Sequence, residues 1–201
     1  MSRRQNQASP PSSNQENFWL EAVKTIGLSL ILAFGVRTFA AGAYNVASGS
    51  MQPNLQINDK FLVDKVTYHF EDPRRGDIVV FSPTAELKRE QYHDAFVKRV
   101  IGLPGERVEL RDGKVYIKNK LLQENNYLTS EQRTSVDVCT VGQKPYLSQP
   151  VTIPPNSYLV LGDNRNNSYD GRCWGLVPRQ NIVGRAMVRF WPLAHIDTFE
   201  K

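Results

Sequence analysis

Apolar residues are distributed unevenly along this 201-residue chain, and the distribution constrains its fold. One long apolar run, residues 26–36, lies near the N-terminus, and the runs that follow it are short and bounded by Gly, Pro, Asp or Asn. Short runs of β-branched and aromatic residues between such turn residues are typical of strands. We therefore expect a helix over residues 18–43. A mainly β domain of folded antiparallel sheets, or a partly closed barrel, should follow over residues 44–201.

Three interpretations of the helix stay open: a retained membrane span, a cleaved secretory signal and a buried amphipathic helix. A span needs about 20 residues, and residues 19–46 supply that length only by including Glu21, Lys24 and Arg37. We favour a single retained span, because Arg37 can extend its charge to the interface. Basic residues precede the apolar run, and after Arg37 none occurs until Lys60. The positive-inside rule then places the N-terminus in the cytoplasm and the β domain on the far side.

Composition and periodicity place the remaining segments. Residues 1–17 are rich in Ser, Gln, Asn and Pro and should form a disordered cytoplasmic tail. Residues 123–150 are polar and lack clear periodicity, so we expect an inserted loop or small subdomain near residues 106–155. Asp112-Gly113 between two strand-like runs predicts a hairpin turn. The predicted strands cover residues 77–81, 95–101, 107–110, 114–118, 157–161 and 182–190.

The composition argues against nucleic-acid binding and metal-dependent chemistry. The formal net charge of +5 fits a solvated basic surface and would also suit anionic lipid headgroups. No basic cluster is interleaved with aromatic residues as in nucleic-acid binders. The three histidines are scattered and no Cys/His spacing is typical of zinc, so we expect no metal and no cofactor. Cys139 and Cys173 could pair if the domain is exported, but the sequence leaves this pairing open.

A serine and a lysine are the first candidate reactive groups. Ser50 follows Gly49 shortly after the apolar run, and a flexible glycine lets the backbone turn to present a nucleophile. Lys98 lies in an apolar strand pattern, on one face with Phe96 and Val100. If that face is buried, the pKa of Lys98 falls and the neutral amine can accept the serine proton. Alternation by itself leaves open that Lys98 faces solvent.

A polar segment after the strand at residues 157–161 is the next candidate. Residues 162–175 are dense in Gly, Asn, Asp and Ser, which indicates a tight loop held by its own hydrogen bonds. Long polar loops on rigid strands are where functional sites are often built, although a purely structural turn is the alternative. The charges of this loop alternate in sign, which suits internal ion pairs: Asp163, Arg165, Asp170 and Arg172.

Four blocks of sequence form an ordered set along the chain. They are Ser48-Gly49-Ser50-Met51-Gln52-Pro53-Asn54-Leu55, Arg75-Gly76-Asp77-Ile78-Val79-Val80-Phe81, Val97-Lys98-Arg99-Val100-Ile101-Gly102-Leu103-Pro104-Gly105-Glu106, and the loop at residues 162–175. This set resembles the type I signal peptidase (leader peptidase) family of the Ser/Lys kind. The first block resembles the nucleophile box, the second a structural box, the third the lysine box and the fourth the family's third box. With the N-terminal helix, they cover most of residues 18–192.

The resemblance implies a role for each matching residue. Ser50 takes the position of the nucleophile and Lys98 that of the general base. Ser168 matches a hydroxyl that orients the lysine amine, and Ser48 matches a hydroxyl that forms the oxyanion hole with the Ser50 backbone N–H. Framework ion pairs are implied for Arg99, Asp163, Asp170 and Arg172. Shallow substrate pockets are implied for Tyr44, Val46, Met51, Phe96 and Val97.

The function implied is that of a membrane-bound serine endopeptidase that removes signal peptides from exported preproteins through an acyl-enzyme. Pockets that exclude large side chains would fit cleavage after Ala-X-Ala. The implied partners are preprotein signal peptides and the lipid bilayer, for a monomer that binds no nucleic acid. The implied location is the plasma membrane, with a single pass and the catalytic domain on the extracytoplasmic side. Residues 166–170 look closer to the thylakoid processing peptidase branch, so a thylakoid membrane, with the domain facing the lumen, is the alternative.

Departures from the family pattern and other functions are also considered. Asn166, Gly171 and Ala47 replace residues common in the family, which bears on loop rigidity and pocket shape. A Ser/Lys autoprotease like the SOS-response repressors would use the same chemistry, and an anchored peptide-binding module would use none. A Ser/His/Asp hydrolase built on His93 and Asp94 is weaker, because adjacent residues point apart and no nucleophile elbow is present.

Overall fold

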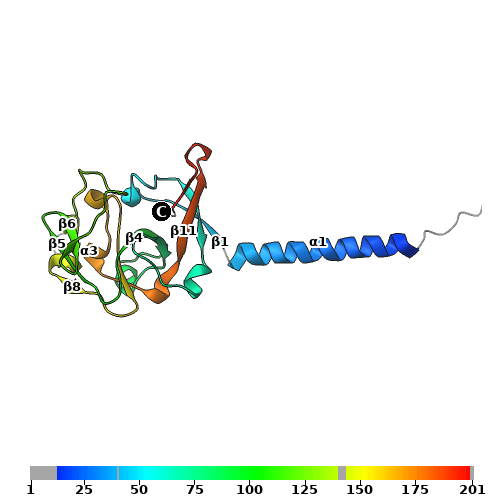
Figure 1. The fold of residues 1–201 in the computed structure, drawn as a ribbon, viewed down its shortest axis with the longest axis horizontal. Helices are drawn as coiled ribbons and strands as arrows, with labels where there is room; N and C mark the ends of the chain where they lie inside the picture. Colours follow the sequence, from blue (N-terminus) through cyan, green and yellow to red (C-terminus); the bar gives the residue numbers. More distant parts are fainter. Residues whose placement is uncertain (1–12, 40, 140–143, 200–201) are drawn as a thin grey trace, which may run out of the picture. The chain divides into compact units, whose positions relative to one another are not determined.

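The computed structural model describes residues 13–39, 41–139 and 144–199, and the chain divides into two compact units, Met1–Ala40 and Ala41–Lys201. The described residues of the first unit form one helix, α1, over Ser13–Phe39 (Figure 1). The expected tail is therefore wrong for residues 13–17, which are helical, and its first twelve residues lie outside the described ones. The helix also ends before residue 43, because residues 41–45 pair with a second strand instead.

Within the three described ranges, no helix is both long enough and apolar enough to cross a membrane. The predicted span over residues 18–43 is thus not confirmed. Glu21 and Lys24, which interrupt the apolar residues of α1, form an exposed ion pair of 3.1 Å.

The second unit is built on an antiparallel sheet of eight strands. Their order is β1-β2-β11-β3-β4-β9-β10, with β12 paired to β11. The prediction of a mainly β domain with antiparallel sheets is confirmed. The strands are β1 Ala41–Asn45, β2 Lys60–Asp64, β3 Ile78–Phe81, β4 Phe96–Gly102, β9 Ser157–Leu161, β10 Val177–Pro178, β11 Ile182–Trp191 and β12 Asp197–Thr198.

A smaller sheet of four strands lies at the opposite end of this unit from β1 and β11 (Figure 1). Its order is β7-β6-β5-β8, and it occupies the part of the chain where an inserted subdomain was expected. The predicted hairpin is confirmed: Asp112 and Gly113 join β5 to β6 with φ angles of 51° and 73°, the left-handed values that a tight hairpin turn needs. The strands are β5 Arg107–Arg111, β6 Lys114–Ile117, β7 Lys120–Leu121 and β8 Val151–Thr152.

Short helices connect the strands. Two are α-helical, α2 Ala85–Arg89 and α3 Gly171–Trp174. Each is capped by the side chain that precedes it: Thr84 accepts a hydrogen bond from the Leu87 N–H, and Asp170 from the Arg172 N–H. Six more in the described part of the chain are single 3-10 turns: η1 Gly49–Met51, η2 Thr67–His69, η3 Tyr146–Ser148, η4 Arg165–Asn167, η5 Arg179–Asn181 and η6 Leu193–His195.

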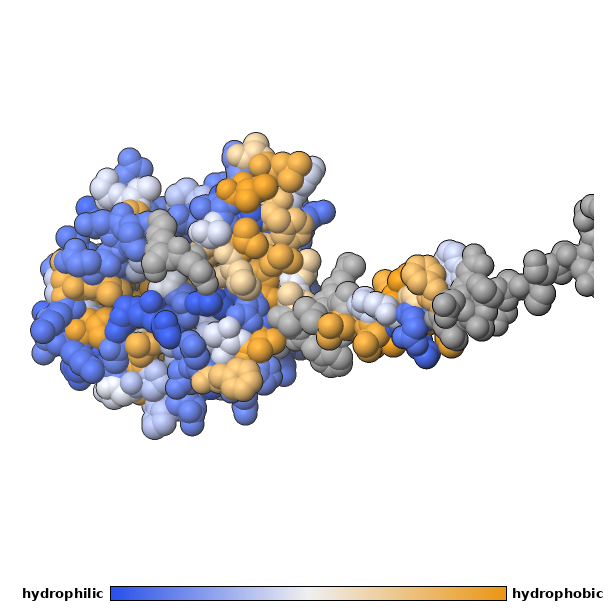
Figure 2. Space-filling model, turned by 45° about the vertical axis from the view of Figure 1, so that its right-hand side comes forward, coloured by the Kyte–Doolittle hydropathy of each residue, from blue (hydrophilic) through white to orange (hydrophobic). Residues whose placement is uncertain are grey.

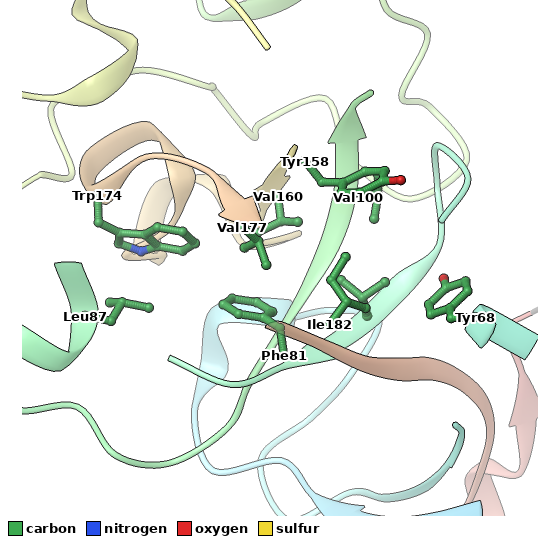
Figure 3. Close-up of a cluster of buried hydrophobic side chains, with 10 residues drawn as sticks. Tyr68, Phe81, Leu87, Val100, Tyr158, Val160, Trp174, Val177 and Ile182 are labelled. Atoms are coloured by element: carbon green, nitrogen blue, oxygen red, sulfur yellow. The ribbon is translucent and has the colours of Figure 1, made fainter. Parts of the chain in front are cut away.

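Among the residues described in the β-rich unit, three clusters of buried side chains form the core. Figure 3 shows one of them, in which the rings of Phe81 and Trp174 pack with centroids 5.8 Å apart. Strand β4 contributes to separate clusters, with Val100 in this one and Ile101 in another. Both faces of β4 are therefore covered. Lys98 is buried, and it would be buried whichever face of the strand it pointed from.

Candidate active site

Ser50 lies in the single turn η1, which residues 46–48 connect to β1. The turn is closed by a hydrogen bond of 3.1 Å from the Gln52 N–H to the Gly49 carbonyl. Its next residue, Met51, is fully buried in the core, which anchors the turn against the sheet. Ser50 itself retains 8% of its surface. The turn therefore holds the hydroxyl at the boundary between the core and an open cavity.

Lys98 reaches the same point from the centre of the sheet. On β4 it pairs with Val79 of β3, and its side chain is 3% exposed. Its Nζ lies 2.7 Å from the Ser50 Oγ and donates a hydrogen bond of 3.1 Å to the Val97 carbonyl. A hydroxyl and an amine at this separation are within range for direct proton transfer. The structure thus brings together the two residues predicted as nucleophile and base, although 48 positions separate them in the sequence.

Burial makes the Lys98 amine easy to deprotonate. Removal from water lowers the pKa of Lys98 from 10.5 to about 8, since the low-polarity surroundings penalise the ammonium. The nearby Asp170 and Asp163 carboxylates act in the opposite direction, and Arg172 adds to the lowering. A substantial fraction of the amine is therefore neutral near pH 8 and can accept a proton.

Two other predicted serines flank the pair. Ser48 is exposed, and its hydroxyl donates to the Ser50 Oγ at 3.3 Å. Ser168 is buried, and its Oγ has no hydrogen-bond partner among the residues that the structure describes. The predicted contact of Ser168 with the Lys98 amine is therefore not seen. Ser168 nevertheless lies close to Ser50, because a Cβ added at Gly162 would meet both the Ser168 Oγ, at 2.2 Å, and the Ser50 carbonyl, at 2.5 Å.

An open cavity of about 300 Å³ is lined by both Ser50 and Lys98. Of the predicted pocket residues, Tyr44, Phe96 and Val97 line it. Val46 and Met51, also predicted as pocket residues, do not line this cavity and are at most 1% exposed in the core. The remaining lining residues are Asn45, Ala47, Ser48, Phe61, Val80, Gln91, Tyr92, His93, Asp94 and Ala95.

His93 and Asp94, the basis of the Ser/His/Asp alternative, thus lie in the same cavity. The group at hydrogen-bond distance from the Ser50 Oγ is nevertheless the Lys98 amine. A larger cavity of about 740 Å³, lined by Arg74, Arg75 and other polar residues, includes neither Ser50 nor Lys98. The candidate site is therefore the smaller cavity, because the larger one lacks the buried Ser50–Lys98 pair.

The four charged residues predicted to form framework ion pairs do so, as two buried pairs. Arg99 and Asp163 form a bidentate pair, with distances of 2.8 Å from Nε to Oδ1 and 2.6 Å from Nη2 to Oδ2. Arg172 binds Asp170 in the same way, at 2.8 and 2.9 Å. These pairs connect β4 to the loop at residues 162–175 and stabilise the loop internally.

Asp170 is the best-satisfied carboxylate of this framework. Burial alone would raise its pKa, but the hydrogen bonds and charge of Arg172, with the Gly162 N–H at 2.9 Å, outweigh burial and lower it. Asp170 therefore stays ionised at neutral pH. Its charge favours protonation of the neighbouring Lys98, which keeps the amine pKa from falling further.

The sequence did not predict the ion pair between Arg165 and Glu124. Arg165 is fully buried and forms a bidentate ion pair with Glu124, at 2.6 and 3.1 Å. The loop pattern did identify the Arg165 charge, but Glu124 comes from a segment without periodicity and gave no signal. Asn164, whose side chain donates a hydrogen bond of 3.0 Å to the Gly49 carbonyl, was also not predicted as a candidate, although it lies in the polar loop that the pattern singled out.

A disulfide joins Cys139 to Cys173, with Cα atoms 5.3 Å apart. The pairing that the sequence left open is therefore formed. It fastens the segment before residue 140 to α3, the helix that Asp170 caps. Among the described residues, no cluster of three or more His, Cys, Asp or Glu side chains could hold a metal ion.

A buried amine against a serine hydroxyl, set in a β-sheet domain beside an open cavity, is the arrangement of a candidate serine hydrolase. Comparison with known proteins is consistent with this class. The sequence pattern of the family described as "Signal peptidase, peptidase S26" matches residues 19–191. The chain therefore belongs to this family and is a type I signal peptidase, a serine protease that removes signal peptides.

Signal peptidases and a thylakoidal processing peptidase are among the similar proteins. The "Probable signal peptidase I-2" of Synechocystis sp. is 49% identical over 188 residues, which cover 94% of this chain and 78% of that protein. The "Signal peptidase I" of Leptolyngbya laminosa is 52% identical over 176 residues, 87% of this chain and 80% of that protein. The "Thylakoidal processing peptidase 1, chloroplastic" of Arabidopsis thaliana is 33% identical over 182 residues, 88% of this chain and 50% of that protein.

Proposed function

We propose that this enzyme cuts preproteins after Ala-X-Ala by means of a Ser50–Lys98 dyad and an acyl-enzyme. One observation supports the dyad above all: the Nζ of a lysine that is 3% exposed lies 2.7 Å from the hydroxyl of a serine at the edge of a cavity. Burial of Lys98 penalises its charged ammonium form and so favours the neutral amine, which is the form that can accept a proton. Lys98 then acts as general base, and Ser50 acts as nucleophile.

In the acylation step, the neutral Lys98 amine accepts the Ser50 hydroxyl proton while the Ser50 Oγ attacks the substrate carbonyl carbon. The carbonyl oxygen becomes an oxyanion, which the Ser50 backbone N–H and the exposed Ser48 hydroxyl stabilise. The C–N bond then breaks, and the leaving amine takes the proton from Lys98. The signal peptide remains as an ester on Ser50.

In the deacylation step, water attacks the ester carbonyl and gives its proton to the same amine. The second tetrahedral intermediate collapses with cleavage of the bond to the Ser50 Oγ, which recovers its proton from Lys98. The signal peptide leaves as a carboxylic acid. No group other than the two side chains and water is needed to balance these steps.

The substrate is proposed to bind as an added strand. On one side, Phe96–Lys98 of β4 pair with β3, but β9 pairs with β4 only from Arg99 onward. Within the described part of the chain, no strand covers the second edge of β4 at residues 96–98. Such an edge carries free backbone donors and acceptors that an extended peptide can use. Ala47, Ser48 and Ser50, from the segment after β1, line the same cavity as this edge of β4.

Specificity for small residues would follow from the lining of this cavity. Tyr44, Phe61 and Phe96 are large and partly or fully buried, so they limit its depth beside the Ser50 hydroxyl. A methyl side chain fits such a shallow apolar space, whereas a larger side chain would clash with the aromatic rings. Ala is therefore expected at the residue before the cut.

Membrane association is proposed on the distribution of apolar surface. Leu28, Ile31 and Leu32 of α1 are each at least two-thirds exposed. The β-rich unit also shows apolar surface at a projecting corner (Figure 2), and Trp191 and Leu193 are exposed where β11 leads into η6. Exposed apolar surface of this kind is typical of membrane or protein interaction sites. An enzyme held at the membrane would meet signal-bearing substrates there at raised effective concentration.

The decisive experiment uses the full chain in detergent with a synthetic preprotein peptide that contains Ala-X-Ala. Ser50→Ala and Lys98→Ala are each expected to reduce cleavage by at least about 1000-fold. Ser148→Ala and Lys114→Ala are the matched controls, since both residues are exposed and away from the cavity. A peptide with Trp at the residue before the cut should remain uncleaved. Normal cleavage by either dyad variant would exclude the proposed mechanism.

A further inference from the structure

Asn164 makes two hydrogen bonds to the backbone of the nucleophile turn. Its side-chain Nδ2 donates to the Gly49 carbonyl at 3.0 Å, and its own backbone N–H donates to the Ser50 carbonyl at 3.0 Å. Asn164 comes from the polar loop, directly before η4, so these bonds join two segments that lie 115 residues apart in the sequence. The two successive carbonyls of the nucleophile turn are thus held by one residue.

The Gly49 carbonyl shares a rigid peptide unit with the Ser50 N–H. A trans peptide is planar, and its C=O and N–H point in opposite directions. Fixing the direction of the Gly49 oxygen therefore fixes the direction of the Ser50 N–H, which is the backbone donor of the proposed oxyanion hole. Hydrogen bonds to the oxygen also polarise the unit and strengthen the N–H as a donor.

The Gly49 oxygen accepts a second hydrogen bond, from the Gln52 N–H at 3.1 Å, so this peptide unit is held from two sides. The loop that carries Asn164 is itself rigid. Its neighbours Asp163 and Arg165 are both fully buried and form bidentate ion pairs with Arg99 and Glu124. An oxyanion donor stabilises a developing charge best when its direction is set before the reaction. The loop therefore supplies a preorganised support for that donor.

We propose that Asn164 is a positioning residue that aims the Ser50 backbone N–H at the oxyanion. This inference rests on the proposed Ser50–Lys98 mechanism and assigns to Asn164 an effect on the transition state. Asn164 touches neither the cavity nor the reacting atoms directly, so substrate binding should be little changed. The chemical step should be slowed instead, because a misdirected donor stabilises the oxyanion less.

The test measures kcat and KM separately for the full chain in detergent on the Ala-X-Ala peptide. Asn164→Ala is expected to lower kcat about 10- to 100-fold, less than or similar to removal of an oxyanion donor, with KM changed by less than about twofold. Asn164→Asp keeps the side-chain shape but replaces the amide donor with an acceptor. A similar loss of kcat is therefore expected at a pH where the carboxylate is ionised. Asn166→Ala is the matched control, because this asparagine of the same loop is exposed and contacts residues 131–133 instead.

A second measurement separates positioning of the donor from a general structural role. A peptide aldehyde ending in Ala-X-alaninal binds by addition of the Ser50 oxygen to its carbonyl carbon. The serine proton passes through Lys98 to the former carbonyl oxygen, and this oxygen occupies the oxyanion position. Asn164→Ala should weaken aldehyde inhibition by about the same factor as kcat, while binding of the cleaved signal peptide and the apparent pKa of the pH profile stay unchanged.

The outcomes distinguish this inference from the mechanism beneath it. If wild type and Asn166→Ala cleave and Asn164→Ala matches them in kcat, the positioning role is wrong. It is equally wrong if the loss appears in KM alone, or if Asn164→Asp, which preserves the packing, restores full activity. If Ser50→Ala cleaves as well as wild type, the Ser50–Lys98 mechanism itself fails, whatever Asn164 does.

Discussion

Burial of Lys98 serves the proposed chemistry and opposes folding for the same reason. The surrounding side chains of β3, β4 and the nucleophile turn remove water from the amine, which favours its neutral form. A neutral amine is a base, but a charged one in the same place is poorly solvated. The residue that is proposed to make the enzyme active should therefore also reduce its stability over part of the pH range.

The pH dependence of cleavage should report this amine. Because the neutral form of Lys98 is the base in the proposed mechanism, kcat/KM is expected to rise with pH through an apparent pKa of about 8 and then level off. The measurement is the initial rate on the Ala-X-Ala peptide from pH 6 to 10. A rate that rises only near pH 10.5, the ordinary value for lysine, would contradict a buried base.

Lys98→Met should stabilise the fold while it abolishes cleavage. In the unfolded chain Lys98 has a pKa of about 10.5, so between pH 8 and 10.5 the unfolded state holds more protons and wild-type stability rises with pH. Below pH 8 the penalty for burying the charge is fully present, on the order of 3 kcal/mol. The variant should thus exceed wild type in free energy of unfolding at pH 7, by an excess that shrinks above pH 8.

Denaturant titrations at pH 7 and pH 10 measure this difference. Lys114→Met, on the exposed hairpin, is the control and should change stability little at either pH. A Lys98→Met protein that is less stable than wild type at pH 7 would contradict this prediction. It would mean that the contacts of the amine stabilise the fold by more than burial of its charge destabilises it.

At the scale of elements, the site is formed where the loop after β9 packs against the turn after β1. Asn164 bonds to the turn, Asp163 bonds to Arg99 on β4, and Asp170 closes the loop on itself through the Gly162 N–H. Gly162 is at the closest approach, since a side chain there has no space between Ser168 and the Ser50 carbonyl. The local requirement for glycine is steric.

Gly162→Ala is expected to impair both activity and stability. The added methyl must push the Ser50 backbone or the Ser168 side chain away, and overpacking of this kind costs about 1–3 kcal/mol. A shift of about 1 Å in the nucleophile can lower the rate roughly 100-fold. Melting temperature and kcat/KM measure the two effects. Gly27→Ala, where nothing lies within 4 Å, is the control, and equal behaviour of the two variants would contradict this packing argument.

At the scale of the whole molecule, the chain combines a β-rich unit that contains the site with a helical unit of exposed apolar side chains. The two units have separate tasks in the proposed function. The β-rich unit carries the chemistry, and α1 carries the membrane affinity, so a change in one should leave the other intact.

Leu28→Glu combined with Leu32→Glu should separate these tasks. The two carboxylates oppose insertion of the exposed apolar side chains of α1 into lipid, so flotation with phosphatidylglycerol-containing vesicles should fall sharply. Cleavage of a short soluble peptide in detergent should remain within about twofold of wild type. Leu28→Ile with Leu32→Ile is the control. Unchanged flotation of the glutamate variant would show that α1 does not provide the membrane affinity.

Local patterns were sufficient for the elements whose signals lie within a few residues. The strands at β3, β4, β9 and β11 were predicted to within a residue or two, and the Asp112-Gly113 turn was placed correctly. β1 and β2 were not predicted. Residues 41–45 were assigned to the end of the helix, and only their pairing with β2 identifies them as a strand. The motif blocks also pointed to Ser50, Lys98 and the loop at residues 162–175 as the parts of one site.

The sequence by itself determined the family and the mainly β class and singled out the proposed reactive pair, because these depend on residue types in a local order. Only the tertiary structure decided that both faces of β4 are covered, that Val46 and Met51 belong to the core, that Cys139 pairs with Cys173, and that Asn164 binds the nucleophile turn. These facts depend on which distant segments meet. Side-chain burial and contact are set by the packing of the whole sheet, which no short stretch of residues specifies.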